Sequence, residues 1–154
     1  KSELNEIISA RLEDNYIIQP FIEGKHMSMS LFIYNGDVQL LAANKQEIIL
    51  EDNQISPVSI GVNEYLIYKS EMKELAESIV SVIPGLSGYV GVDLVRTENN
   101  LYVIDVNPRF TTSYTGISQS LGVNITEKIL NTFLDRKMQD ISFSNAKTIK
   151  LSLL

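Results

Sequence analysis

Apolar and polar residues follow two periods along the chain, and these separate the expected strands from the expected helices. Apolar residues at every second position, bounded by Gly, Asn or Pro, are typical of strands, whereas spacings of three and four indicate amphipathic helices. Helical spacing occurs in 3–13, 70–83, 117–121 and 125–134, and extended runs occur in 16–22, 27–34, 38–43, 47–60, 88–97, 101–106 and 147–154. These elements predict a single α+β domain over residues 1–154, with an antiparallel sheet and flanking helices.

Turn and capping signals define where several of these elements begin and end. Asn35-Gly36 lies between two apolar runs, and this dipeptide is favoured in two-residue hairpin turns. A loop is expected at 51–53. The longest expected helix takes Ser70 as its N-cap and ends at Pro84-Gly85.

The strands 88–97 and 101–106 form the hairpin on which the functional prediction depends. A three-residue loop would place Thr97 opposite Leu101 and Asp93 opposite Asp105. Because successive side chains point to opposite faces of a strand, one face of this hairpin is wholly apolar and belongs on the core. That face carries Val90, Val92, Leu94, Tyr102, Ile104 and Val106, and the other face carries Gly91, Asp93, Val95, Val103, Asp105 and Asn107.

Asp93 and Asp105 are therefore expected to face each other across the hairpin. Paired positions bring β-carbons to about 4.5–5.5 Å, and like charges at such positions destabilise a sheet. Either one carboxyl is protonated or a cation lies between the two, and Asn107 adds a neutral oxygen that favours a magnesium site. The structural alternative is two solvated acids on an exposed face, in a register shifted by one or two residues. Gly91 and Val95 lie on the same face as the acids, which favours a cleft there over a solvent-exposed surface.

Composition narrows the chemistry that such a site can support. The chain has 154 residues, of which 44% are hydrophobic and 21% charged, as in one soluble globular domain. The net charge of −6 argues against a nucleic-acid partner, and no apolar run is long enough to cross a membrane. The chain has no cysteine and one histidine, His26, so a metal must be held by oxygen, which favours Mg²⁺, Mn²⁺ or Ca²⁺. Since no signal peptide follows Lys1, a cytoplasmic location is the default expectation.

The runs GYVGVDLV (88–95) and LYVIDVNPR (101–109) resemble the metal-binding hairpin of ATP-grasp enzymes, which include biotin carboxylase, carbamoyl phosphate synthetase and D-alanine–D-alanine ligase. The resemblance implies that Asp93, Asp105 and Asn107 coordinate two magnesium ions on the phosphates of ATP. Both acids are more usually Glu in the family, and the shorter Asp implies a tighter or shifted site. Arg109 matches an arginine that stabilises the phosphoryl or acyl-phosphate oxyanion, with a structural ion pair as its alternative.

The run YIIQPFIEGKH (16–26) is similar to the hinge that holds adenine between the two subdomains of these enzymes. This similarity implies a nucleotide site formed by Gln19, Pro20, Phe21 and Ile22. The carbonyl of Gln19 or Pro20 would accept from the adenine amino group, and the amide of Ile22 would reach the ring. The structural alternative is an edge strand interrupted by Pro20.

Further polar residues fall where the family binds the ribose and the phosphates. His26 stands where the D-alanine ligase pattern has an acid for the ribose hydroxyls, and Glu23 is the local alternative for that role. Asn44-Lys45-Gln46 falls where other members place polar groups that face the phosphates or the co-substrate, which implies a nucleotide contact for Lys45. An ordinary structural histidine and a solvated lysine remain the alternatives.

The run NPRFTTSYTG (107–116) is similar to a group of archaeal and methylotroph ATP-grasp ligases that includes tyramine–glutamate ligases. The resemblance implies an ATP- and Mg²⁺- or Mn²⁺-dependent ligase that joins a carboxylate to an amine through an acyl phosphate. Hydroxyls after Arg109 would bind a substrate carboxylate or orient the loop.

The resemblance implies that residues 1–154 are the C-terminal part of an ATP-grasp fold. The N-terminal subdomain, with its lysines and glycine-rich loop, is expected to be absent from them, so the fragment alone is expected to be inactive. Two alternatives stay open: a noncatalytic nucleotide- or divalent-cation-binding module, and a structural domain without a ligand. A homodimer is compatible with all three.

Overall fold

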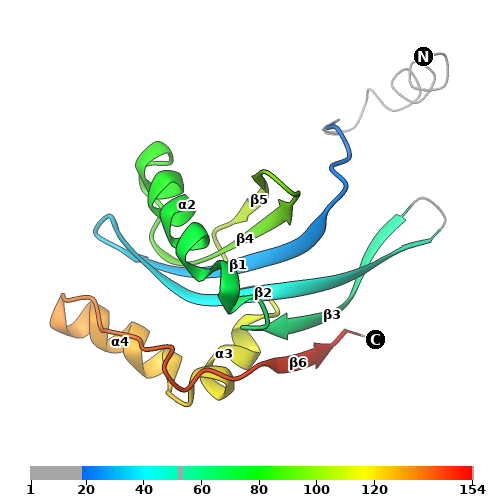
Figure 1. The fold of residues 1–154 in the computed structure, drawn as a ribbon. Coiled ribbons are helices and arrows are strands. Elements are labelled where there is room, and N and C mark those ends of the chain that lie inside the picture. The colour runs from blue at the N-terminus through cyan, green and yellow to red at the C-terminus, as the bar shows by residue number, and fades with distance from the viewer. Residues whose placement is uncertain (1–18, 52–53, 154) are drawn as a thin grey trace, which may run out of the picture.

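An antiparallel six-stranded sheet forms the centre of the computed structural model, which describes residues 19–51 and 54–153 (Figure 1). The strands are β1 (Lys25–Tyr34), β2 (Asp37–Glu51), β3 (Gln54–Val62), β4 (Gly88–Arg96), β5 (Leu101–Asn107) and β6 (Ile149–Ser152), in the order β5-β4-β1-β2-β3-β6. Every neighbouring pair is antiparallel. The predicted α+β class with an antiparallel sheet is confirmed. The expected helix at 3–13 lies outside the described residues.

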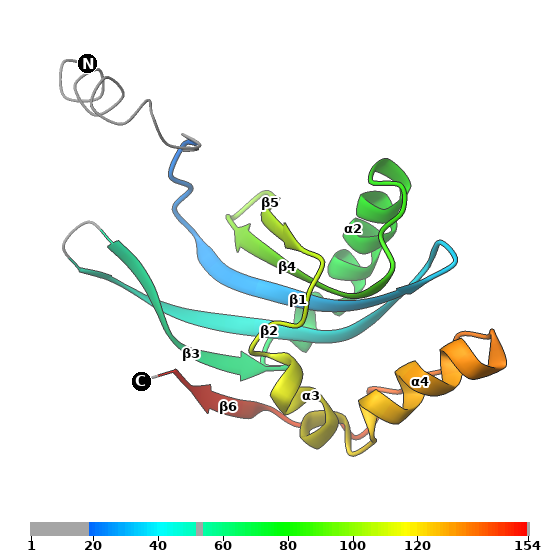
Figure 2. The ribbon, with the colours of Figure 1, turned by 180° about the vertical axis from the view of Figure 1, so that it is seen from behind.

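Helices cover the two faces of the sheet unequally. One face packs against α2 (Lys69–Val82), and the other packs against α3 (Tyr114–Leu121) and α4 (Ile125–Asp135), as Figures 1 and 2 show from opposite sides. The core under α2 includes Met27, Met29, Leu31, Ile33, Met72, Ala76, Ile79, Val90, Val92 and Leu94. The core under α3 and α4 includes Phe32, Leu41, Ala42, Tyr89, Ile117, Leu121 and Ile125. No helix in 19–51 or 54–153 has the length and hydrophobicity needed to cross a membrane.

The β1–β2 hairpin forms as its turn sequence predicts. Tyr34 pairs with Asp37, and the two residues between them, Asn35 and Gly36, have φ angles of 52° and 87°. A two-residue turn of this kind requires positive φ at both positions, which Asn and Gly adopt most easily. β2 then continues to Glu51, well beyond the expected end at 43.

The start of α2 differs from the prediction. A short 3₁₀ turn, η1 (Leu66–Tyr68), leads directly into the helix, and the amide of Lys69 donates to the carbonyl of Leu66. Tyr68 is the N-cap and makes no side-chain capping bond, so the assignment of Ser70 as the cap was wrong. The preceding turn supplies backbone contacts that a capping side chain would otherwise provide.

The β4–β5 hairpin confirms the pairing of Asp93 with Asp105 and corrects the loop that joins the strands. Arg96, not Thr97, faces Leu101, so the loop has one residue more than expected. A register shift between Asp93 and Leu94 compensates, because Leu94 pairs with Val103 and leaves one extra residue in β5.

This bulge changes the faces of β5. The extra residue is Ile104, which lines the open face of the sheet instead of the core. Tyr102 and Val103 are each 40% exposed, so the expected core positions of Tyr102 and Ile104 were wrong, whereas Val106 packs on the core as predicted.

Candidate functional site

The part of the sheet face that α3 and α4 leave uncovered forms a cleft of about 430 Å³. Its walls are mostly apolar, and one carboxylate, that of Asp93, stands among them. The lining residues are Gln19, Pro20, Phe21, Ile22, His26, Gln46, Ile48, Ile55, Pro57, Asp93, Leu94, Val95 and Ile104. A mostly apolar cavity with a few polar groups is typical of small-molecule sites.

A larger cavity, of about 750 Å³, lies beside the β4–β5 loop. Glu23, Lys25, Tyr68 and Arg96 are among its lining residues, and most of its other residues belong to that loop. Asp93 and the apolar hinge residues are not part of it. We therefore take the smaller cleft, where the apolar wall and the carboxylate meet, as the candidate site.

Asp93 is the centre of the polar end of this cleft. It is half-buried, and both of its carboxylate oxygens accept hydrogen bonds from side-chain amides. Gln46 Nε2 in β2 donates to Oδ1 over 2.7 Å, and Asn107 Nδ2 in β5 donates to Oδ2 over 3.1 Å. Side chains from three strands are thereby gathered around one carboxylate. Asp105, its partner across the hairpin, is exposed and accepts from the amide of Val106 over 2.9 Å.

Arg109 is connected to the same group of side chains. Its Nη2 donates to Asn107 Oδ1 over 3.0 Å, and its Nη1 donates to the carbonyl of Phe110 over 3.3 Å. Since Asn107 also donates to Asp93, the amide links the acid to the guanidinium. The exposed side chain of Arg109 makes no ion pair among residues 19–51 and 54–153, which removes support for a structural ion pair there.

The donors at this end of the cleft suit a hard cation. Two paired carboxylates and one amide oxygen offer only oxygen ligands, which Mg²⁺ and Mn²⁺ prefer. No group of three or more His, Asp or Glu side chains gathers within 19–51 and 54–153, so the amide of Asn107 is needed as the third donor. Asn107 presents its amino group to Asp93 and its Oδ1 to Arg109, so to serve as a metal ligand the amide would have to rotate and release Arg109.

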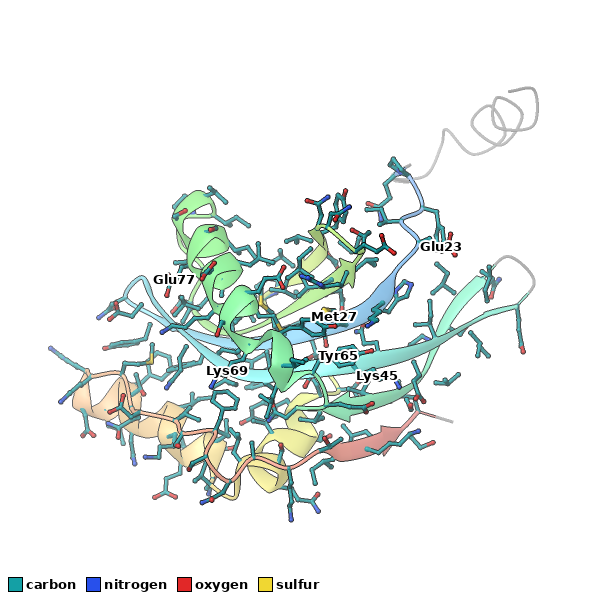
Figure 3. The ribbon with its side chains drawn as sticks, in the orientation of Figure 1. Glu23, Met27, Lys45, Tyr65, Lys69 and Glu77 are labelled. Atoms are coloured by element: carbon teal, nitrogen blue, oxygen red, sulfur yellow. The ribbon has the colours of Figure 1, made fainter. Side chains whose placement is uncertain are left out.

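The hinge residues and His26 lie in the cleft with Asp93. Gln19, Pro20, Phe21 and Ile22 line its wall, and His26 in β1 pairs with Val95 in β4, two residues from the acid. Phe21 is 66% exposed, so its ring is available for contact. Glu23 lines the larger cavity instead (Figure 3).

Lys45 lies on the opposite face of the sheet from Asp93. The neighbouring Gln46 points to the acid, and successive side chains of a strand alternate in direction. Lys45 Nζ lies 3.1 Å from Glu47 Oε1 and 3.3 Å from Glu64 Oε1, on the side of the sheet that carries α2 (Figure 3). The structure therefore does not bring Lys45 together with the other predicted site residues.

An ion-pair group surrounds Lys45 and joins three strands. The Ser59 hydroxyl hydrogen bond, followed by those from Lys45 and Lys150, lowers the pKa of Glu47 from 4.5 to about 2. The hydrogen bond with Glu47 in turn raises the pKa of Lys45. Because Glu47, Ser59 and Lys150 lie on β2, β3 and β6, these contacts hold neighbouring strands together.

The structure also shows site residues that the sequence did not single out. Gln46, expected only as one of three polar residues, is the one that contacts Asp93 directly. Ile48, Ile55 and Pro57 form an apolar wall from the long β2–β3 hairpin, within the extended run that the sequence predicts over 47–60. Residues 44–47 are all polar, so no alternation of polar and apolar residues marks which of them face the cleft.

Comparisons with known proteins identify the family of this sheet and cleft. A protein-family profile described as an ATP-grasp domain matches residues 2–113. The tyramine–L-glutamate ligase of Methanocaldococcus jannaschii is 33% identical over 105 residues, which cover 68% of this chain and 32% of that protein. The corresponding ligase of Methanocaldococcus fervens is also 33% identical over 105 residues, 68% of this chain and 34% of that protein. The chain thus spans about a third of the length of these curated relatives.

Solved structures agree with this result at the level of the fold. The crystal structure of an ATP-grasp superfamily protein from Archaeoglobus fulgidus superposes with a TM-score of 0.62 at 26% identity, over 87% of this chain and 40% of that one. An N5-carboxyaminoimidazole synthetase from Staphylococcus aureus, complexed with ADP, superposes with a TM-score of 0.71 at 18% identity, over 100% of this chain and 40% of that one. With its sheet, its paired acids and these matches, the chain belongs to the ATP-grasp family.

Proposed function

We propose that this chain is the nucleotide- and metal-binding part of an ATP- and Mg²⁺-dependent carboxylate–amine ligase. The observation that carries the proposal is the pairing of Asp93, at the polar end of an apolar cleft, with Asp105 on the neighbouring strand. An apolar cavity suits a purine base, and adjacent oxygen ligands suit the cation that accompanies its phosphates. The family membership supports the same assignment.

Each part of the cleft has a role in this proposal. The hinge, from Gln19 to Ile22, holds the base, and His26 hydrogen-bonds a ribose hydroxyl. Asp93, Asp105 and Asn107 hold Mg²⁺ or Mn²⁺, which when bound offsets the negative charge of the phosphate oxygens.

Arg109 stabilises charge at the reacting phosphoryl group. Its guanidinium is exposed and bonds to Asn107, one of the proposed metal ligands. In the proposed reaction a substrate carboxylate oxygen attacks the γ-phosphorus of ATP, forming an acyl phosphate and releasing ADP. The amine then attacks the acyl carbon, and phosphate leaves as the amine loses a proton. A positive, fixed guanidinium lowers the energy of the charge that develops in both steps.

The remaining parts of the enzyme would come from segments that this chain does not span. We expect the longer protein to supply the lysines and the glycine-rich loop over the phosphates, and to act in the cytoplasm. The names of the two curated relatives suggest glutamate and tyramine as the first carboxylate and amine to test.

The direct test is trapping of the acyl phosphate in the full-length protein. Hydroxylamine converts an acyl phosphate to a hydroxamate, so wild-type protein with ATP, Mg²⁺ and glutamate should form hydroxamate and release phosphate. Arg109→Ala should lower this rate by about 10²–10³-fold while MgADP binding persists. Lys137→Ala, at an exposed position after α4, is the matched control and should retain the wild-type rate.

Two results would contradict the proposed activity. Tight MgADP binding without hydroxamate or phosphate release, for any carboxylate and amine tried, would identify a noncatalytic nucleotide-binding module. An unchanged rate in Arg109→Ala would remove Arg109 from the reaction.

A further inference from the structure

A buried group of hydroxyls joins β1 and β4 to the loop 108–113. Tyr89 in β4 is 6% exposed, and its hydroxyl donates to Ser30 Oγ over 2.9 Å. The same hydroxyl lies 2.9 Å from Thr111 Oγ1 and 3.4 Å from Ser113 Oγ. Ser113 Oγ lies a further 3.1 Å from Ser30 Oγ and 3.0 Å from Thr111 Oγ1. One phenol therefore connects two hydroxyls of the loop with the middle of the sheet.

The ring of Tyr89 and Gly91, two residues further along β4, also contribute to the position of this loop. Phe110 stacks on Tyr89, with ring centroids 5.2 Å apart and planes inclined by 30°. A β-carbon placed on Gly91 would lie 2.5 Å from Thr111 Cγ2, so the loop crosses the strand at the one residue type that leaves room. Figure 2 shows the segment between β5 and α3 passing over the sheet at this level.

Arg109 lies in the middle of this fixed loop. On one side the loop begins at Asn107, the last residue of β5, whose amide accepts from Arg109 and donates to Asp93. On the other side it is held through Thr111 and Ser113. The guanidinium itself bonds only to Asn107 and Phe110 among the described residues, so its position depends on the backbone that carries it.

We propose that Tyr89 is a positioning residue, which through Thr111 and Ser113 fixes the loop carrying Arg109 over the cleft. Its phenol touches neither the proposed nucleotide nor the metal ligands, and it acts on the reaction only through that loop. Thr111 and Ser113 are committed to internal hydrogen bonds and so orient the loop rather than bind a substrate carboxylate. A buried polar network in which every member is satisfied favours one arrangement over its alternatives. This inference rests on the proposed ligase activity.

The test is Tyr89→Phe in the full-length protein, which removes the hydroxyl and keeps the stacked ring. A displacement of about 1 Å at a catalytic group lowers rates by up to about 10²-fold, so kcat for ATP-dependent phosphate release with glutamate and tyramine should fall about ten- to hundredfold. KM for ATP and the Kd of MgADP should change less than about twofold, because the variant leaves the hinge and the metal ligands in place. Tyr65→Phe, on the α2 side of the sheet, is the control and should behave as wild type.

Hydrogen exchange of the loop separates the anchoring from the activity. Loss of the hydrogen bonds that the phenol makes with Thr111 and, over a longer distance, Ser113 should speed exchange of the amides over 110–116 at least about fivefold in Tyr89→Phe and leave them unchanged in Tyr65→Phe. Unchanged exchange in Tyr89→Phe would show that Tyr89 does not anchor the loop. Faster exchange with an unchanged kcat would show that anchoring of the loop has no role in the reaction. A wild-type protein that releases no phosphate would overturn the proposed activity, while the exchange rates would still decide the anchoring.

Discussion

Replacing Asn44 by alanine would remove a fully buried amide that connects β1, β2 and the turn after β3. Asn44 Nδ2 donates to Ser28 Oγ over 3.3 Å and to Ser30 Oγ over 3.4 Å. Its Oδ1 accepts from the backbone amide of Asn63 over 3.3 Å. Alanine can replace none of these contacts, although its smaller side chain fits without a clash.

The loss of stability depends on which hydrogen bonds each partner of Asn44 keeps in the variant. Ser30 keeps the hydrogen bond from Tyr89, so its loss is small. The Asn63 amide, in a residue that is 4% exposed, loses its acceptor, and a buried unsatisfied donor of this kind costs about 1–3 kcal/mol. Adding the weaker contact to Ser28 gives an expected loss of about 2–3 kcal/mol in the free energy of opening the sheet.

Native-state hydrogen exchange measures this loss in the full-length protein, because it reports the opening of this sheet separately from other parts of the chain. A loss of 2–3 kcal/mol corresponds to exchange about 30- to 150-fold faster for the amides of Met29 and Leu31, in the central strand. Asn99→Ala, in the exposed β4–β5 loop, should change the opening free energy by less than about 0.5 kcal/mol. A rise below about fivefold in Asn44→Ala would refute the reasoning, since it would mean that water satisfies the freed groups.

Three further predictions concern the two faces of the sheet. Gln46→Ala should raise the Mg²⁺ concentration needed for half-maximal enhancement of ADP binding about ten- to hundredfold, because it removes the donor that orients Asp93. An unchanged Mg²⁺ titration would contradict this. Lys45→Ala should change ADP affinity less than about twofold, since Lys45 lies on the other face, and a tenfold loss in calorimetry would show that it reaches the nucleotide. The pKa of Glu47 is lowered to about 2, so its contribution to stability is present above pH 4.5 and is lost as the pH falls toward 2. Glu47→Gln should therefore show a shallower loss of stability across that interval in acid unfolding, and a curve parallel to wild type would contradict the assignment.

Local patterns were enough to predict much of this fold. Asn35-Gly36 predicts its hairpin because only a few residues adopt the required positive φ. The expected apolar stripe of α2 faces the core at Met72, Leu75, Ala76 and Ile79 but not at its last member, Ile83, which is 37% exposed. The strand order β5-β4-β1-β2-β3-β6 could not be predicted in this way, since it depends on contacts between distant segments. The 3₁₀ turn that replaces the expected cap at Ser70 depends on such contacts as well.

The sequence predicted the acids of the β4–β5 hairpin but not the cleft residues that other strands and the bulge contribute. Asp93 and Asp105 face each other as predicted because the bulge at Ile104 offsets the one extra residue of the loop and restores the expected register. The bulge that moves Ile104 into the cleft leaves no signal in the sequence. For 44–46, alternation shows that Lys45 points away from Gln46, but only the packed sheet shows which of the two faces the cleft.

The central claim is that Asp93 in the cleft and its strand partner Asp105 hold the cation of a bound nucleotide, and calorimetric titration of ADP into the full-length protein tests it most directly. We predict that binding with Mg²⁺ weakens more than about tenfold when EDTA replaces the metal, and equally in Asp105→Asn with Mg²⁺ present. Asp37→Asn, at the exposed β1–β2 turn, should bind MgADP as wild type does. Equal affinity in the wild type with Mg²⁺, the wild type with EDTA and Asp105→Asn would contradict the account.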